Sequence, residues 1–394
     1  MRKLLQINVT ANWGSTGKIA ESIGLTAIQN GWESYLAYGR YSNPSQSHLI
    51  QVGSRPDVYA HYAEQRIRDN EGLASRGATR KLIQQIREIQ PDVVQLHNIH
   101  DHYLNYRLLF EYLNTTDIQV VWTFHDCWAF TGHCFHFVTE GCERWKTQCR
   151  DCPLQHSSPN TLLDRSRKNY EEKKRLFAGC KHLTIVPCSD WMGGFVKESF
   201  LKDKRMQVIH NGVDLKVFQP SLQRKKQNVF RILAVSNVWH QAKGLYDLYE
   251  LRKRLPDGYE LTMVGLSAEQ LKELPEGIRG IQRTQHVQEL AALYGEADVL
   301  VNPTYADTFP TVNLEALACG TPVITYRTGG SPEAVDEKTG IVVPQGDVDA
   351  LVAAIRQLRE HPLSGENCRK RAEEHFDKDL CFQQYIDLYN RLLG

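Results

Sequence analysis

Two carboxylates bracket a short helical pattern in the stretch ADTFPTVNLEALACGTPV at 306–323. Asp307 precedes a phenylalanine–proline pair. Glu315 lies about one turn inside the expected helix, which Pro310 suits as first residue and Gly320 as end. Backbone N–H groups at a helix start are unpaired and carry the positive end of the helix dipole, so they suit a diphosphate. Carboxylates repel phosphate but accept hydrogen bonds from hydroxyls. The stretch therefore predicts a ligand with a diphosphate flanked by two polyols, which describes a nucleotide sugar.

The same pair of carboxylates also has a purely structural interpretation. In that interpretation Asp307 caps the helix and Glu315 is a solvated helix residue. The preceding residues, ADVLVNPT at 297–304, have the pattern of a buried strand. The pair would then lie where a strand of an α/β sheet ends, which is where such sheets bind ligands.

Strand patterns alternate with helical patterns along the whole chain. The first half opens with a strand at 3–9, a helix at 17–31 and a strand at 33–39, and it has a further helix at 79–90. Later strands are expected at 92–99, 119–125 and 182–189, and in the second half at 230–238, 259–266, 278–284, 297–304, 321–327 and 339–344. Each half therefore predicts a doubly wound parallel α/β sheet. The polar, basic stretch PSLQRKKQN at 220–228 is typical of a linker between domains.

Length and charge narrow the class of protein. A chain of 394 residues is too long for one ordinary core, so two domains are expected. The 47 basic and 46 acidic residues nearly cancel, which argues against a nucleic-acid-binding protein. The N-terminal apolar run turns polar at Asn8, so it predicts a buried strand rather than a secretory signal. We expect a cytoplasmic protein whose ten cysteines are reduced thiols or metal ligands.

Several motifs together resemble the retaining glycosyltransferases of the GT-B fold, family four. Asp307 and Glu315, followed by EALACGTPVI, resemble the E-x7-E signature of that family. Further matches are GSTG at 14–17, FHD at 124–126, HNGVD at 210–214, KG at 243–244 and TGGSPE at 328–333. More narrowly, LHNIH at 96–100, WTFHDCWAFTGHC at 122–134 and the stretch 302–333 look like the colanic-acid-type branch, whose members build bacterial capsular and exported polysaccharides.

The resemblance implies a domain plan and an activity. Residues 1–215 would form the acceptor-side Rossmann-like domain with a cysteine-rich insert near 127–152. Residues 216–375 would form the donor-binding domain across a cleft, and the helix at 376–394 would cross back to the first domain. The implied reaction moves a hexose from a UDP- or GDP-linked sugar to a surface glycan or polyprenyl-linked oligosaccharide, with retention of anomeric configuration. A nucleotide-sugar epimerase, a sugar phosphorylase and a catalytically silent sugar-nucleotide-binding protein are the alternatives. No G-x-G-x-x-G follows either first strand, which argues against a dinucleotide oxidoreductase.

The resemblance also assigns roles on the donor side. Lys243 and the helix-start N–H groups would stabilise the charge that grows on the leaving diphosphate, without a metal ion. The family usually has an arginine where this chain has Asn237. Either Lys243 and the helix start neutralise more of the diphosphate charge, or another cation such as Arg327 or Arg283 supplies the missing charge. The family usually has glutamate at the first acidic position, where this chain has Asp307. The implied donor-binding positions are Gly14, Gly17, Asn237, Lys243, Arg283, Asp307, Thr308, Phe309, Pro310, Thr311 and Glu315, and the implied catalytic positions are His125, Lys243, Asp307 and Glu315.

The first half supplies two features near the expected donor sugar. His125 follows a strand, at a position where the family commonly has a histidine that lines the donor sugar, and His97, His100 and His102 compete for that role. The loop 12–17 is followed by Lys18, so Gly17 and Lys18 match the Gly-Lys pair of a P-loop. A P-loop also needs glycine at position 12 and serine or threonine at position 19, where this chain has Asn12 and Ile19. We therefore expect this loop to approach the donor closely without binding a nucleoside triphosphate.

A cysteine cluster forms the second constellation. Four cysteines, Cys134, Cys142, Cys149 and Cys152, lie in an irregular stretch of the first half. Ordering such a loop is costly, and a tetrahedral zinc ion on four sulfurs would tie it together while leaving no open position for catalysis. The alternative is a set of packed free thiols.

For the acceptor, the sequence offers basic residues around 165–168 and 173–177. They could face anionic lipid headgroups or a pyrophosphate-linked carrier, which predicts peripheral contact with the inner face of the plasma membrane. A solvated helix face is the competing interpretation.

Overall fold

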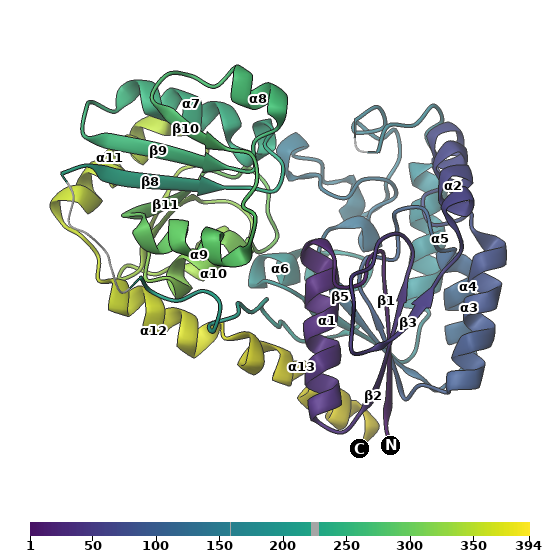
Figure 1. Ribbon diagram of the computed structural model, residues 1–394. Coiled ribbons are helices and arrows are strands. Elements are labelled where there is room, and N and C mark those ends of the chain that lie inside the picture. Colours follow the sequence, from purple (N-terminus) through teal and green to yellow (C-terminus); the bar gives the residue numbers. More distant parts are fainter. Residues whose placement is uncertain (158, 222–227) are drawn as a thin grey trace. The chain divides into compact units, whose positions relative to one another are not determined.

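The computed structural model describes residues 1–157, 159–221 and 228–394, so most of the predicted linker at 220–228 lies outside the described residues. The chain divides into two compact units (Figure 1). Unit 1 comprises Met1–Ile209 and Phe382–Gly394, and unit 2 comprises His210–Cys381.

Unit 1 is built on a parallel sheet in the order β3-β2-β1-β4-β5-β6-β7. The strands are β1 (Lys3–Asn8), β2 (Glu33–Tyr38), β3 (His48–Gln51), β4 (Val93–Leu96), β5 (Gln119–Phe124), β6 (Leu183–Pro187) and β7 (Arg205–Met206). The five strands expected in this half are present, each ending one to three residues earlier than the pattern suggested, whereas the short edge strands β3 and β7 were not foreseen. The order reverses between β1 and β4.

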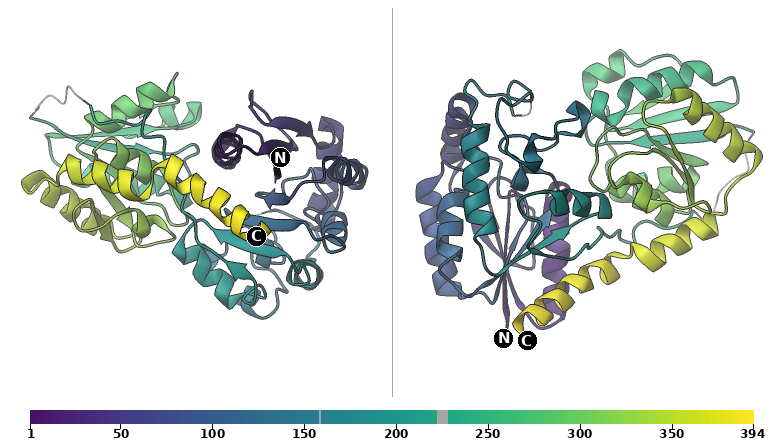
Figure 2. Two further views of the ribbon diagram at one scale, coloured as in Figure 1. Left: turned by 90° about the horizontal axis from the view of Figure 1, so that it is seen from below. Right: turned by 180° about the vertical axis from the view of Figure 1, so that it is seen from behind.

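Helices cover both faces of this sheet (Figures 1 and 2). They are α1 (Gly14–Gln29), α2 (Arg55–Arg68), α3 (Arg76–Ile89), α4 (Tyr106–Leu113), α5 (Ser166–Ala178), α6 (Asp190–Glu198) and the end of α13 (Lys378–Leu393). Successive strand residues point to opposite faces. Leu5 of β1 belongs to the same core as Leu82 of α3, while Leu4 packs in the core that contains Ile23 of α1 and Tyr389 of α13. The C-terminal helix thus completes one face of the first sheet.

Unit 2 has a parallel sheet in the order β10-β9-β8-β11-β12-β13. The strands are β8 (Phe230–Val235), β9 (Tyr259–Val264), β10 (Ile278–Ile281), β11 (Val299–Asn302), β12 (Val323–Tyr326) and β13 (Gly340–Val343). The helices are α7 (Leu245–Arg254), α8 (Ala268–Lys272), α9 (Val287–Glu296), α10 (Thr311–Ala318), α11 (Val348–Glu360) and α12 (Gly365–His375). All six predicted strands are present. The order reverses between β8 and β11, and a crevice at the carboxyl ends of such strands is the usual ligand position in this type of sheet.

Both sheets confirm the predicted α/β class with two doubly wound parallel sheets. In the described part of the chain, no helix combines the length and the apolar character needed to cross a membrane.

Candidate functional site

The two carboxylates of the opening stretch lie at the reversal point of the second sheet. Strand β11 ends at Asn302, the loop 303–310 follows, and α10 begins at Thr311. The neighbouring strand β8 ends at Val235, and the loop after it leads to a 3-10 turn at Gln241–Lys243. Because β8 and β11 are adjacent and parallel, both loops leave the same edge of the sheet.

The start of α10 differs by one residue from the prediction. Pro310 was expected as the first helical residue, but its ψ of 116° is extended, so it is the N-cap residue and Thr311 begins the helix. No side chain caps this start, and the first turn of α10 contains no acidic residue. The structural interpretation of Asp307 as a helix cap is therefore wrong. The positive end of the α10 dipole is the kind of environment that a phosphate prefers.

Lys243 and Asp307 form an ion pair, with 2.6 Å between Nζ and Oδ2. The two loops that carry them are joined by the backbone: the N–H of Tyr305 donates to the carbonyl of Ala242 at 2.8 Å. Gly244 has a φ of +75°, and a Cβ there would lie 2.2 Å from the carbonyl oxygen of Pro303. Only glycine permits this close approach, so the Lys-Gly pair fixes the ammonium group beside the acidic loop.

Glu315 is held from the protein side by Tyr294 of α9. The Tyr294 hydroxyl donates to Glu315 Oε2 at 2.8 Å, and Tyr294 is fully buried. Burial, with the Glu315 charge, raises the pKa of Tyr294 well above its ordinary value, so the phenol remains a donor. Glu315 itself is half-buried, so its interpretation as a fully solvated helix residue is wrong.

A buried polar network supports the corner from beneath. Asn302 donates to Asn313 at 2.9 Å, Asn313 donates to the Ser331 hydroxyl at 2.9 Å, and Thr325 pairs with that hydroxyl at 2.6 Å. These bonds connect the ends of β11 and β12 with α10 and with the turn at Ser331–Ala334. This network was not predicted from the sequence. A polar Asn at the buried end of β11 and another on the inner face of α10 were the available signals.

The remaining donor-side positions differ in their surroundings. Asn237, Arg283 and Arg327 are exposed. Phe309 is buried, and its ring stacks on His210 at 4.7 Å between ring centroids. Thr308 is also buried.

The order of the strands distinguishes Arg327 from Arg283 by their distance from β11. Arg327 directly follows β12, the neighbour of β11, whereas Arg283 follows β10, three strands from β11. At about 4.8 Å between strands, this is a difference of about 10 Å across the sheet.

In unit 1 the glycine loop lies at the other reversal point, after β1. Gly14 has a φ of +65° and is the first residue of α1. Gly17 is buried, and a Cβ there would lie 2.6 Å from the Thr10 hydroxyl. Gly17 therefore serves close packing inside unit 1, while Gly14 has open space beside it.

His125 follows β5 and pairs with His97 at 3.1 Å from Nε2 to Nδ1. Gln6 fixes the direction of these hydrogen bonds. Its amide nitrogen donates to the Ala20 carbonyl, so its oxygen accepts from His97 Nε2 at 3.1 Å. His97 Nδ1 then accepts from His125 Nε2, which leaves Nδ1 of His125 as a hydrogen-bond acceptor.

Burial also keeps both imidazoles neutral. Burial lowers the pKa of His125 to about 4, and burial together with His125 places the pKa of His97 well below its ordinary value. A neutral His125 suits hydrogen bonding to a hydroxyl rather than ion pairing with a phosphate.

The competing histidines have partners within unit 1. His100 Nε2 lies 2.8 Å from Asp126, and His102 Nε2 lies 3.0 Å from Glu71. Burial alone would lower the pKa of His100, but the Asp126 carboxylate raises it above the ordinary value. His100 is therefore paired with Asp126, and His102 lies beside Glu71.

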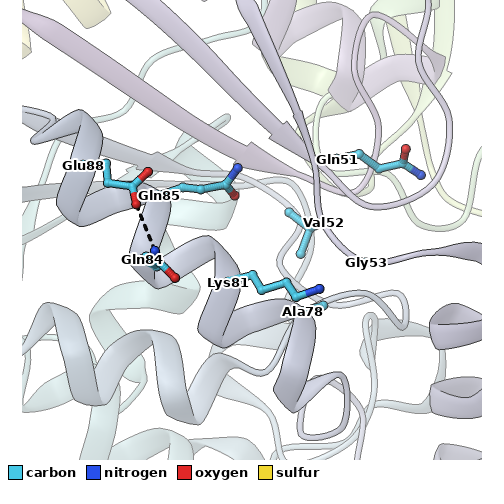
Figure 3. Close-up of a pocket in the computed structure, with 8 residues that line it drawn as sticks. All are labelled: Gln51, Val52, Gly53, Ala78, Lys81, Gln84, Gln85 and Glu88. Atoms are coloured by element: carbon cyan, nitrogen blue, oxygen red, sulfur yellow. Dashed lines mark hydrogen bonds between the residues drawn. The ribbon is translucent and has the colours of Figure 1, made fainter.

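Two further hollows lie in unit 1. A surface hollow between the end of β3 and α3 is lined by Gln51, Val52, Gly53, Ala78, Lys81, Gln84, Gln85 and Glu88 (Figure 3). None of the predicted site residues lines it, and Gln84 donates to Glu88 across its wall at 3.0 Å. Elsewhere in unit 1, the four predicted zinc ligands line one small cavity.

The predicted basic surface around 173–177 requires a correction. Lys173 is buried, and its Nζ donates to the carbonyls of Trp128 and Thr131 at 2.7 and 3.1 Å. It is therefore an internal residue, and only its neighbours Lys174 and Arg175 are exposed on this stretch.

Comparisons with known proteins agree with this architecture. The model of Glycosyltransferase Family 4 matches residues 21–217, and that of Glycosyl transferases group 1 matches residues 229–361. The chain belongs to glycosyltransferase family 4. It has the GT-B fold, in which two Rossmann-like domains are joined in one chain.

One relative matches the whole chain and another matches about half of it. A putative colanic acid biosynthesis glycosyl transferase, WcaC of Escherichia coli K12, is 25% identical over 99% of this chain and 100% of its own length. The MMP alpha-(1->4)-mannosyltransferase of Mycolicibacterium hassiacum is 31% identical over 48% of this chain and 49% of its own.

Solved structures show the same fold at low identity. Sucrose-phosphate synthase from Thermosynechococcus elongatus has a TM-score of 0.75 at 18% identity, covering 100% of this chain and 99% of that one. HepE from Anabaena, solved in complex with UDP and glucose, has a TM-score of 0.66 at 16% identity, covering 99% and 100%.

Proposed function

We propose that this glycosyltransferase takes a hexose from a UDP- or GDP-linked donor, with retention of configuration, and adds it to a growing surface polysaccharide on a lipid-linked carrier. The observation that carries the donor class is the corner at β8 and β11. This corner combines the uncapped start of α10 with the Lys243 ammonium group and with two carboxylates, Asp307 and Glu315, that belong to one short segment. The whole-length similarity to WcaC supports polysaccharide biosynthesis as the setting.

Each group in the corner has a distinct task in the proposal. The backbone N–H groups at the start of α10 and Lys243 bind the diphosphate and stabilise its charge as the glycosidic bond breaks. Asp307 exchanges its bond to Lys243 for a hydroxyl of the donor sugar, while Glu315, held by Tyr294, accepts from the ribose. Arg327 supplies a further positive charge to the diphosphate at the start of α10, since it follows β12, the strand next to β11. This set of groups needs no metal ion to neutralise the diphosphate.

His125 completes the proposed donor contacts through Nδ1. In the tautomer that the bond to His97 sets, this nitrogen is an acceptor, which is the kind of group to which a sugar hydroxyl donates. Gly14 of the glycine loop allows the backbone to approach the donor closely. Exposed basic residues of α5, among them Lys174, are the proposed contacts with an anionic carrier or membrane surface.

The proposal is tested by binding first and by transfer second. Purified protein is titrated with UDP, GDP and ADP and then with their hexose derivatives, by calorimetry. We expect one base to bind at least tenfold more tightly than the other two, and Glu315→Gln to weaken that binding. Glu273→Gln, at an exposed position in the same unit, is the matched control.

Transfer is then followed with lipid-linked acceptor and the preferred donor, and the anomeric configuration of the product is read by NMR. A product with inverted anomeric configuration would contradict the retaining mechanism. Nucleotide binding that is unaffected by Glu315→Gln would contradict the assigned donor site. Turnover of the donor that requires inorganic phosphate, or that yields an epimer without acceptor, would indicate a phosphorylase or an epimerase instead.

A further inference from the structure

The cysteine-lined cavity of unit 1 has the composition of a metal site. Its walls include the four cysteines Cys134, Cys142, Cys149 and Cys152 together with His133. It has a volume of about 10 Å³, which is room for about one atom of water size. Four sulfurs and one imidazole around a space this small are a donor set that suits zinc.

An unsatisfied nitrogen gives an independent indication. His133 Nδ1 is 2.6 Å from the Asp69 carboxylate, and both side chains are 1% exposed. Nε2 of the same ring is buried and has no hydrogen-bond partner. A buried imidazole held by a carboxylate on one nitrogen, with the other nitrogen unsatisfied, is the arrangement found beside bound metal ions. Asp69 is itself fixed, because its second oxygen accepts from the backbone N–H of Arg165 at 2.9 Å.

The sulfurs are also surrounded by donors that favour a thiolate. The Gly132 N–H donates to Cys149 Sγ at 3.2 Å, and the Leu154 N–H donates to the sulfur of Cys152. The buried Lys173 side chain interacts with Cys149 and Cys134.

We propose that the sulfurs of Cys134, Cys142, Cys149 and Cys152 bind one structural zinc ion, with His133 as a positioning residue whose Nδ1–H donates to Asp69 and fixes the backbone next to Cys134. Among the described residues, no three of these donor atoms lie within 4.8 Å of one another. Four sulfurs on one zinc ion lie about 3.8 Å apart, since each is about 2.3 Å from the metal. Binding therefore draws the side chains inward and tightens the loop.

The ion would tie together a long irregular segment. Between η1 (Trp128–Phe130) and α5, the described residues contain only two 3-10 turns, Val138–Glu140 and Arg144–Lys146. The cross-link would hold this segment over the carboxyl end of β5, the strand that leads to His125. This inference does not depend on the donor site in unit 2.

The test measures metal content and stability of the full-length protein, purified without chelators. We expect about one zinc per chain by elemental analysis, loss of zinc in Cys149→Ser, and retention in Cys180→Ala, which changes a buried cysteine outside the cavity. His133→Asn is expected to weaken zinc affinity by about 10- to 100-fold while keeping the metal site. Cobalt exchanged into the wild-type protein should give the thiolate-to-metal charge-transfer band of a sulfur-rich tetrahedral site.

Wild-type protein provides the decisive measurement if Cys149→Ser fails to fold. Chelation should lower its melting temperature and zinc should restore it. A folded wild-type protein that contains no metal and gains no stability from added zinc would overturn the proposal. A protein mass that is two hydrogens lower for each disulfide would also overturn it, because one or two disulfides would then stand in place of thiolates.

Discussion

Replacing Lys243 by alanine separates catalysis from stability. The ion pair with Asp307 is partly solvated, with side-chain exposures of 31% and 21%, so its contribution to folding is below about 1 kcal/mol. In the proposed transition state the same ammonium faces a departing diphosphate, and removing one such preorganised group costs about 3 to 4 kcal/mol. We therefore expect kcat/KM to fall by about 10²- to 10³-fold, with a melting temperature within a few degrees of wild type.

The assay is release of nucleoside diphosphate with saturating acceptor, alongside a thermal melt of each variant. Lys243→Arg keeps the charge and should recover part of the activity. Lys272→Ala, at an exposed position on α8, should behave as wild type. If Lys243→Ala is folded and retains activity within about threefold of wild type, Lys243 does not stabilise the leaving group and the reasoning fails.

Three further outcomes are expected. Tyr294→Phe removes the donor to Glu315 and should cost about 1 kcal/mol of stability in urea unfolding, with weaker nucleotide binding in calorimetry; unchanged binding would show that Glu315 needs no support. The pKa of His125 is about 4 in the folded protein, below its ordinary value of 6.5, so between these two pH values the unfolded chain binds more protons than the folded one. The free energy of unfolding should therefore fall as the pH falls from about 6.5 to 4. His125→Asn should flatten that dependence. Gly329→Ala places a Cβ 1.8 Å from the Asp307 carbonyl oxygen at a φ of +57°, so it should lower both melting temperature and activity, and a variant as active as wild type would show that the Asp307 loop tolerates displacement.

The periodic patterns were sufficient to predict the fold class. Strands of Val, Ile and Leu at regular intervals between helical patterns are buried on both faces, and this local signal does not depend on distant residues. Short edge strands such as β3 carry little of it, because only part of an edge strand is buried, and they were missed. The position of Asp307 and Glu315 at a strand-to-helix corner could also be predicted, since both belong to one continuous segment.

The sequence by itself thus determined the alternation of strands and helices, the corner at 302–311 and the family. The tertiary structure decided which groups meet: Lys243 with Asp307, Tyr294 with Glu315, and His133 with Asp69. These partners lie 21 to 64 residues apart in the chain. Their contact depends on strand order and on burial, and neither is encoded in the local pattern around either residue. Lys173 shows the same limit, because a side chain that the sequence placed on a surface is held inside by two carbonyls and an aromatic ring that only the folded loop brings together.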